Sequence, residues 1–350
     1  MSDVERPTPV ALRRGPIAAM ATSGPLVDGF GRAHTDLRVS ITDRCNLRCV
    51  YCMPEEGIVF GARDEILTYE ELLRVVRVAH AIGVRTVRLT GGEPLVRRGI
   101  VEFVRRLAQI GLDDIAMTTN AMDLARHASA LAGAGLNRVN VSCDSLRADR
   151  FAEVRRRGDL ATVLSAMDVA DRVGLGPVKV NVVLLAGVND DEVLDFAAFA
   201  RETARVVRFI EFMPLDGDHN WDRSKVVESA HVIERIDQVW PLERVQQIND
   251  VAPAARYRFR DGRGEIGVIA TVTQPFCGTC DRLRLTADGH VRNCLFSEEE
   301  TPLRVAMREG CDDGAIETAL RRAVWAKKAG RGSDDLTLLR PRRSMSMIGG

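Results

Sequence analysis

From residue 36 onward, short runs of β-forming residues alternate with amphipathic helical runs, and this alternation restricts the possible folds more than any other feature. The predicted strands are 36–42, 85–90, 114–119, 137–142, 177–185 and 206–212. The segments between them carry apolar residues at helical spacing, for example in 69–83, 99–111, 124–135 and 190–202. Strands and helices in this order predict a parallel sheet with right-handed crossovers. An incomplete (βα)6 barrel and an open doubly wound sheet both satisfy the pattern.

The pattern changes after about residue 214, where a polar loop is followed by β-type runs at 265–272 and 282–296. Asp288-Gly289 in the second run predicts a hairpin turn, and helical segments follow near 301–309 and 313–328. We therefore expect an α/β unit over 34–213, a C-terminal extension over 214–340 that does not fold separately, and a tail over 341–350. Residues 1–33 are rich in Pro, Gly and Ala without a clear period, which predicts a mobile tail.

Charge and composition narrow the class of protein. The formal net charge is zero, so the chain has no overall basic field for nucleic acid or an acidic membrane surface. No apolar run reaches the roughly 20 residues needed to cross a bilayer, and the N-terminal residues lack the apolar core of an export signal. We expect a cytoplasmic protein, in which the eight cysteines stay reduced and are available for metal or redox roles.

Three cysteines, Cys45, Cys49 and Cys52, are spaced Cys-x3-Cys-x2-Cys in the sequence "DRCNLRCVYCMP". Three thiolates can hold three irons of a [4Fe–4S] cluster and leave the fourth iron open to a small molecule. The alternatives are zinc and accidental clustering. Zinc prefers paired CxxC units or CxxC with His, and no His lies near this loop. The spacing therefore favours a cluster.

A second group of three, Cys277, Cys280 and Cys294, is spaced Cys-x2-Cys-x13-Cys. The predicted hairpin folds Cys294 back beside the other two. Zinc is a stronger competitor here, because CxxC with a distant Cys is common in structural zinc sites. A fourth ligand is then needed, and the nearby His290 is predicted at the turn, away from the cysteines. A second three-cysteine cluster is favoured, while Cys143 is predicted to be a buried small apolar residue.

These motifs carry a family resemblance. The segments "LRVSITDRCNLRCVYCMPEEG" and "VRLTGGEPLVRR" resemble the radical SAM superfamily, and "FCGTCDRLRLTADGHVRNCLF" with the terminal "SMIGG" is similar to the GTP 3′,8-cyclase family of molybdenum cofactor biosynthesis. The resemblance runs from about residue 30 to residue 350. It implies an incomplete (βα)6 TIM-type barrel, two [4Fe–4S] clusters, and S-adenosyl-L-methionine (SAM) on the open iron of the first. The guanine of GTP would occupy the open iron of the second.

The resemblance also implies site residues. The SAM contacts would be Tyr51, Gly92, Ser142 and Met213, with Glu93 as a supporting partner. Since the chain has no GxxxxGK[ST] loop, separate cations must bind the triphosphate, and the implied GTP contacts are Arg38, Arg88, Thr118, Lys179, Arg282, Leu283 and Arg284. Catalytic roles would fall to Arg282, Arg284, Gly349 and Gly350. We expect these positions at or near the C-terminal ends of strands, where barrel active sites are built.

One position departs from the family pattern. The family usually has Gly after "TTN", where this chain has Ala121. If the backbone there is left-handed, Ala costs roughly 1 kcal/mol.

The implied reaction begins when an electron from a low-potential donor of flavodoxin or ferredoxin type splits SAM. The 5′-deoxyadenosyl radical takes hydrogen from ribose C3′ of GTP, C3′ bonds to guanine C8, and the product passes to cyclic pyranopterin monophosphate synthase. The protein would be a monomer or homodimer. Two alternatives are a radical SAM peptide maturase with an auxiliary cluster, which usually has more C-terminal cysteines, and a non-catalytic iron–sulfur electron carrier, which would not need "LTGGEP".

Overall fold

The computed structural model describes residues 19–216, 220–246, 251–330, 343 and 345–349. Within these residues the strands form one 12-stranded sheet in the order β12-β11-β10-β1-β2-β3-β4-β5-β6-β9-β8-β7. The order is linear and does not close on itself in the described part of the chain. The six parallel strands lie in chain order from β1 to β6, whereas a doubly wound sheet reverses its strand order at a switch point. The fold is therefore an incomplete barrel and not the open doubly wound sheet that periodicity also allowed.

The central strands run parallel, each paired with the next along the chain. They are β1 Asp36–Ser40, β2 Thr86–Thr90, β3 Asp114–Thr119, β4 Arg138–Ser142, β5 Lys179–Leu184 and β6 Val206–Glu211. Each lies within two residues of its predicted bounds. Strand prediction succeeds here because β-branched residues flanked by Gly and polar breaks give a strong local signal.

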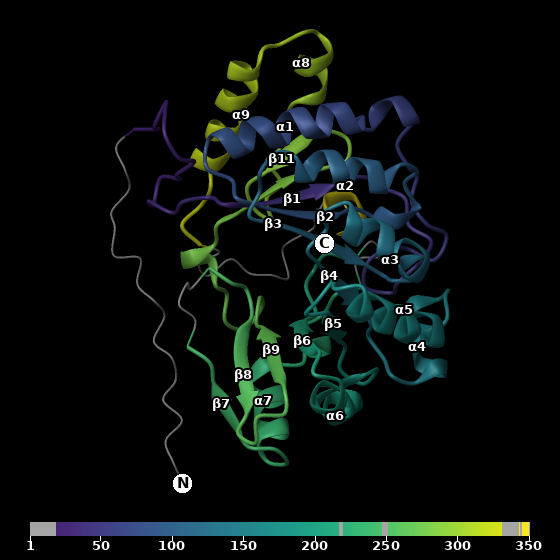
Figure 1. The fold of residues 1–350 in the computed structure, drawn as a ribbon. Coiled ribbons are helices and arrows are strands. Elements are labelled where there is room, and N and C mark those ends of the chain that lie inside the picture. The colour runs from purple at the N-terminus through teal and green to yellow at the C-terminus, as the bar shows by residue number, and fades with distance from the viewer. Residues whose placement is uncertain (1–18, 217–219, 247–250, 331–342, 344, 350) are drawn as a thin grey trace.

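Helices cover the outer face of these strands (Figure 1). They are α1 Tyr69–Ala81, α2 Ile100–Ala108, α3 Leu124–Gly133, α4 Ala148–Arg155, α5 Leu160–Arg172 and α6 Val193–Thr203. The Thr68 side chain accepts from the Glu71 backbone N–H at the start of α1, and Asp159 caps α5 in the same way. Such caps satisfy backbone N–H groups that have no partner inside the helix.

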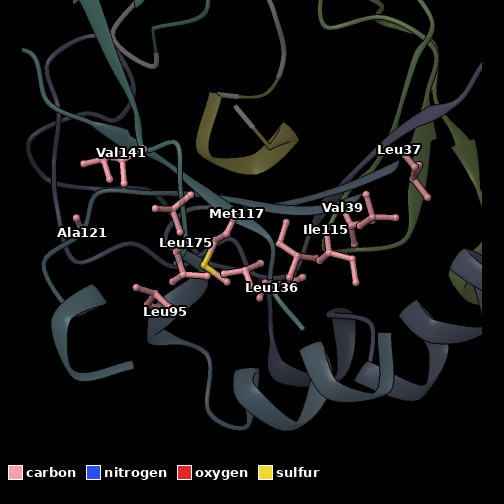
Figure 2. Packing of buried hydrophobic residues seen from close by; sticks show 14 of the residues in the cluster. Leu37, Val39, Leu95, Ile115, Met117, Ala121, Leu136, Val141 and Leu175 are labelled. Carbon is pink, nitrogen blue, oxygen red and sulfur yellow. The ribbon is translucent and has the colours of Figure 1, made fainter. Parts of the chain in front are cut away.

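Side chains alternate strictly along the strands. Leu37, Val39 and Met117 are fully buried against the helices (Figure 2). The neighbours Arg38 and Thr118 point to the other face, where Figure 2 also shows the short C-terminal helix α10, Met345–Ile348. Parallel strands are usually apolar on both faces, so polar residues on the inner face indicate a space built for ligands.

The C-terminal extension adds strands to both edges of the barrel sheet. β9 Glu265–Ile269 pairs in parallel with β6, followed outward by β8 Ala255–Phe259 and β7 Leu242–Arg244. At the other edge β10 Arg282–Leu285 pairs in parallel with β1. The sheet continues outward from β10 with β11 His290–Arg292 and β12 Thr301–Pro302. The predicted Asp288-Gly289 hairpin is confirmed, and the strands of the extension share one sheet with those of the barrel.

The remaining helices lie mainly in this extension. They are α7 Ser229–Asp237, α8 Arg304–Arg308 and α9 Asp313–Trp325. The predicted helix 301–309 is shorter than expected because its first residues form β12. The described residues also contain the 3-10 turns η1 Arg63–Glu65, η2 Pro94–Val96, η3 Asp190–Glu192, η4 Arg223–Lys225 and η5 Cys277–Thr279. No described helix is both long and apolar enough to cross a membrane.

The predicted tail over 1–33 is wrong in its second half. Residues 1–18 lie outside the described part of the chain, but Leu26 and Asp28 are at most 1% exposed. The Leu26 N–H donates to Ile82 O at 2.8 Å, and Val27 forms an isolated bridge with Ala33. The segment folds without a period of its own because contacts with distant parts of the chain hold it.

Candidate active site

A cavity of about 280 Å³ lies inside the barrel, and both three-cysteine groups line it. The cysteines are Cys45, Cys49, Cys52, Cys277, Cys280 and Cys294. They reach the same space because β10, which lies between Cys280 and Cys294, pairs with β1, which precedes the first group. The two motifs thus face one interior from opposite ends of the chain. All the cysteines are free thiols.

The first three-cysteine loop is built to receive sulfur-bound metal. The Leu47 N–H and the Arg155 guanidinium donate to Cys45 Sγ at 3.4 Å and Cys49 Sγ at 3.3 Å. Burial raises the pKa of Cys45 to about 12 and also raises the pKa of Cys52. A bound metal must therefore displace the thiol protons, and the N–H donors are placed to stabilise the thiolates that result.

The turn after β2 holds this loop by close backbone approach. A Cβ on Gly92 would lie 2.3 Å from Arg44 O, and one on Gly91 would lie 2.4 Å from Thr42 O. The Gly92 N–H donates to Thr42 O at 2.7 Å, and the Glu93 N–H to Arg44 O at 2.8 Å. The glycines of "LTGGEP" are therefore required by the cysteine loop itself.

Glu93 joins this turn to the end of β3. Its carboxylate accepts from Thr119 Oγ1 and from the Asn120 N–H, both at 2.7 Å. Burial raises the pKa of Glu93 to about 7, against these hydrogen bonds, which lower it. Asn120 in turn lies 3.9 Å from Cys45 Sγ. Glu93 thus supports the cysteine loop through Asn120.

All four residues predicted to contact SAM line the cavity: Tyr51, Gly92, Ser142 and Met213. The Tyr51 hydroxyl donates to Asp144 Oδ2 at 2.8 Å, and Arg155 pairs with the same carboxylate at 2.8 Å. Asp144 therefore connects the cysteine loop to the end of β4. The SAM contacts themselves stay predictions.

Four arginines with few polar partners form a basic wall of the cavity. Arg38, Arg88, Arg282 and Arg284 line the cavity with Thr118. Burial lowers the pKa of Arg38 well below its usual range, and the charges of Arg284 and Arg88 lower it further. In the described residues, Nε of Arg38, Arg88 and Arg282 has no hydrogen-bond partner. Buried like charges without partners are costly, so this wall is suited to a polyanion.

Sequence reasoning missed Arg208 on β6. It lines the cavity and donates to Asn140 Oδ1 at 2.9 Å. Burial and the charges of Arg88 and Arg138 lower its pKa to about 9. Strand alternation could have found it, because Arg208 lies between the outward-facing Val207 and Phe209.

Two predicted GTP residues do not line the cavity. The Leu283 side chain is fully buried in the core on the helix side of β10. Lys179 is the first residue of β5, on the same face as the cavity-lining Asn181. Burial, followed by the charges of Arg208 and Arg138, lowers the pKa of Lys179 to about 8.

The expected placement at C-terminal strand ends is wrong for the cations. Arg38 and Arg88 are the middle residues of β1 and β2, and Lys179 begins β5. The first cysteine loop and the predicted SAM residues lie at or after strand ends, and Thr118 lies next to the end of β3. The basic residues lie on the inner face, within the strands. The barrel interior therefore has two levels: the cations along the strands, and the first cysteine loop with the predicted SAM residues at the strand ends.

The second three-cysteine group has its own cationic neighbours. Lys327 Nζ donates to Cys280 Sγ at 3.4 Å and to Arg282 O at 2.8 Å. Burial raises the pKa of Cys280, but Arg282 and Lys327 outweigh it and the net shift is downward. His290 lies 3.1 Å from Asp288 at the turn, as predicted. In the described residues, no three His, Cys, Asp or Glu side chains are arranged to hold a single metal ion.

The C-terminal tail enters the barrel. Met345 and Ser346 line the cavity, and the Arg284 guanidinium donates to Gly349 O. Gly349 has a φ of +74°, and a Cβ there would lie 2.5 Å from Thr90 Oγ1. Only glycine fits this position. Gly350 lies outside the described residues.

The backbone at Ala121 is left-handed, with a φ of +64°. Ala at this position is therefore expected to cost roughly 1 kcal/mol in stability relative to Gly. Cys143 is fully buried, as predicted.

Comparison with known proteins agrees with this geometry. Residues 39–200 match the radical SAM superfamily and residues 205–332 match Molybdenum Cofactor Synthesis C. The GTP 3′,8-cyclase of Streptomyces coelicolor is 48% identical over 93% of this chain and 96% of its own length. That of Rhodopirellula baltica is 44% identical over 97% of this chain and 96% of its own length.

Solved structures show the same fold at low identity. The crystal structure of Streptococcus suis SuiB bound to precursor peptide SuiA has a TM-score of 0.58 and 14% identity, covering 89% of this chain and 66% of that one. Native anSMEcpe with bound AdoMet has a TM-score of 0.54 and 15% identity, covering 80% and 82%. An incomplete parallel barrel with a three-cysteine loop after its first strand defines the radical SAM class of enzymes. Within that class, the chain belongs to the GTP 3′,8-cyclase family.

Proposed function

We propose that this chain cyclises GTP to (8S)-3′,8-cyclo-7,8-dihydroguanosine 5′-triphosphate, the first step of molybdenum cofactor (molybdopterin) biosynthesis. Family membership supports the reaction, and one structural observation supports the assignment of its site to these residues. Two three-cysteine groups face a single cavity lined by several arginines, of which Arg38, Arg88 and Arg282 have an Nε–H without a hydrogen-bond partner in the described residues. This arrangement suits two clusters and a polyanionic substrate.

The first group fits a [4Fe–4S] cluster with one open iron. Cys45, Cys49 and Cys52 would supply three thiolates, and hydrogen bonds from Leu47 and Arg155 would stabilise two of them. When bound, the cluster and SAM supply the 5′-deoxyadenosyl radical that takes hydrogen from ribose C3′. The protein holds SAM between Tyr51, Gly92, Ser142 and Met213, which all face the cavity.

The arginine wall would bind the triphosphate. Two opposite charges 4 Å apart interact by about 4 kcal/mol at an effective dielectric near 20, so a few converging cations are enough. Arg38, Arg88 and Arg208 are held in place by their strands. Lys179 would join them at the start of β5, and Thr118 would touch the nucleotide. Fixed cations also orient the ribose, which contributes to catalysis by positioning.

The second group would hold a second [4Fe–4S] cluster whose open iron takes the guanine. Cys277, Cys280 and Cys294 would supply the thiolates, and Arg282 and Arg284 lie on β10, between Cys280 and Cys294. These arginines would stabilise the adduct once C3′ has bonded to C8. Leu283 would contact GTP only through its backbone, because its side chain is in the core. Gly349 would support this site through its hydrogen bond with Arg284, with Gly350 beyond it.

The reaction needs a low-potential electron donor of flavodoxin or ferredoxin type, and its product would pass to cyclic pyranopterin monophosphate synthase. We expect a cytoplasmic monomer or homodimer that binds neither nucleic acid nor membrane. Net charge zero is consistent with that expectation.

Anaerobic incubation with dithionite, SAM and GTP carrying deuterium at C3′ tests the reaction. The expected result is the cyclic product, with deuterium in 5′-deoxyadenosine. Product without deuterium transfer would contradict abstraction at C3′. Two further experiments test the alternative functions, a peptide maturase and an electron carrier. One omits GTP, and the other replaces Arg282 and Arg284 by Ala. Unchanged GTP binding in the double variant would favour a peptide substrate, and no 5′-deoxyadenosine under any condition would favour an electron carrier.

A further inference from the structure

Lys327 lies two residues beyond the end of α9 and is only 5% exposed. Its ammonium is fixed by two hydrogen bonds, to Cys280 Sγ at 3.4 Å and to Arg282 O at 2.8 Å. A buried lysine held against a cysteine sulfur is costly unless the sulfur carries negative charge. Its position therefore points to the group that Cys280 would bind.

The first three-cysteine group has a similar contact with a different charge balance. Arg155 donates to Cys49 Sγ at 3.3 Å, but the same guanidinium is paired with the buried Asp144 at 2.8 Å. Lys327 forms no ion pair with any Asp or Glu in the part of the chain that the structure describes. The cation beside the first cysteine group, Arg155, is thus neutralised by Asp144, whereas the cation beside the second group, Lys327, has no acidic partner among the described residues.

This difference acts on electron affinity. Reduction of a [4Fe–4S] cluster from the 2+ to the 1+ state adds one electron and one negative charge. Net charge and hydrogen bonds to the sulfurs set the potential of such clusters, and a buried cation interacts strongly with added charge because screening is weak. Arg284 adds positive charge on the same side, while the charge of Arg282 is partly offset by Asp281 at 3.9 Å. The effect of Lys327 adds to the charge that remains.

We propose that Lys327 sets the reduction potential of the second cluster, making it easier to reduce than the first. The inference rests on the proposed presence of that cluster. Lys327 acts through Cys280 and contacts no substrate, so it is a positioning residue. A donor able to reduce the first cluster would then keep the second one reduced as well.

The test is an anaerobic redox titration followed by electron paramagnetic resonance. The full chain carries C45S, C49S and C52S, so that only the second group can bind iron. In this background K327M should lower the ratio of reduced to oxidised cluster at least tenfold at a fixed potential, which is about 59 mV for one electron. K327R should keep most of the wild-type potential. K328M is the matched control, because the Lys328 side chain is exposed, and should leave it unchanged.

Iron content separates the possible failures. A background protein that binds no iron would overturn the proposed second cluster itself. Bound iron with an unshifted potential in K327M would overturn only the role of Lys327. If K327M loses iron, the potential is measured in K327Q instead. Gln at this position keeps a hydrogen-bond donor for Arg282 O but carries no charge. An unshifted potential in K327Q overturns the inference, and a tenfold shift supports it.

Discussion

Gly92 shows how much of the site depends on a missing side chain. The family resemblance implies that Gly92 in "LTGGEP" contacts SAM, and Gly92 does line the cavity. Its position also lets the Arg44 carbonyl pass at a distance that no Cβ would tolerate. The cysteine loop and the β2 turn are therefore one unit, and a change in either should disturb iron binding.

Replacing Gly92 by Ala tests this directly. The added Cβ must push the Arg44 backbone away, and such overpacking typically costs about 1–3 kcal/mol in the free energy of unfolding. Iron at the first group should fall by more than half. G133A is the control, since a Cβ on Gly133 meets nothing within 4 Å. Iron assays and thermal melts that do not distinguish the two variants would contradict the claim.

We expect GTP binding to be coupled to protonation of Lys179. Its pKa is lowered to about 8, so it is mostly neutral at pH 9 and mostly charged at pH 7. A bound triphosphate favours the charged form, so binding at pH 8, where Lys179 is about half charged, should take up about half a proton and weaken as pH rises further. Calorimetry in buffers of different ionisation heat measures this uptake. K179M should remove it, and equal uptake in K179M would assign it to another group.

Local pattern predicted some residues and missed others for a physical reason. The inward Arg38 and Arg88 follow from strand alternation, and the same rule applied to β6 would have found Arg208. Lys327 and Arg32 carry no such signal. Their partners lie 47 and 245 residues away in the chain, and only tertiary packing brings them together.

The N-terminal segment before β1 is the least predictable element. Arg32 donates to Cys277 O at 2.7 Å, to Ala329 O at 2.8 Å and to Lys328 O at 2.7 Å. Its guanidinium also pairs with Asp28, whose pKa is lowered to about 2 by hydrogen bonds that outweigh burial. The segment thus fastens the second cysteine loop to the chain that follows α9. Its composition resembles a tail because its contacts are polar and distant in sequence.

Replacing Arg32 by Ala should release this fastening. Asp28 would lose its ion pair but keep His34 at 3.2 Å and the Phe30 N–H at 2.9 Å. The cost in the free energy of unfolding should therefore fall below the roughly 3–5 kcal/mol of an uncompensated buried charge. Iron at the second group should fall, while iron at the first should not change. Denaturant unfolding and iron assays measure both effects. R322A, on the exposed face of α9, is the control. Full iron and stability in R32A would show that the segment only covers the surface.

The whole molecule brings its two metal-binding motifs together through one strand pair. Leu37 on β1 lies opposite Leu283 on β10 in a parallel ladder. The sequence predicts the six parallel strands and each cysteine group separately, since spacing and alternation are local, but it missed β7, β8 and β12. It does not predict which edge of the sheet the late hairpin joins. That pairing brings the Cys277 group to the same cavity as the Cys45 group, as the proposed reaction requires.

Metal analysis of anaerobically reconstituted protein tests the central claim most directly. Two clusters predict about eight irons per chain, falling to about four when either cysteine group is replaced by serine. About four irons in the intact chain, or zinc bound by the C-terminal group, would contradict it.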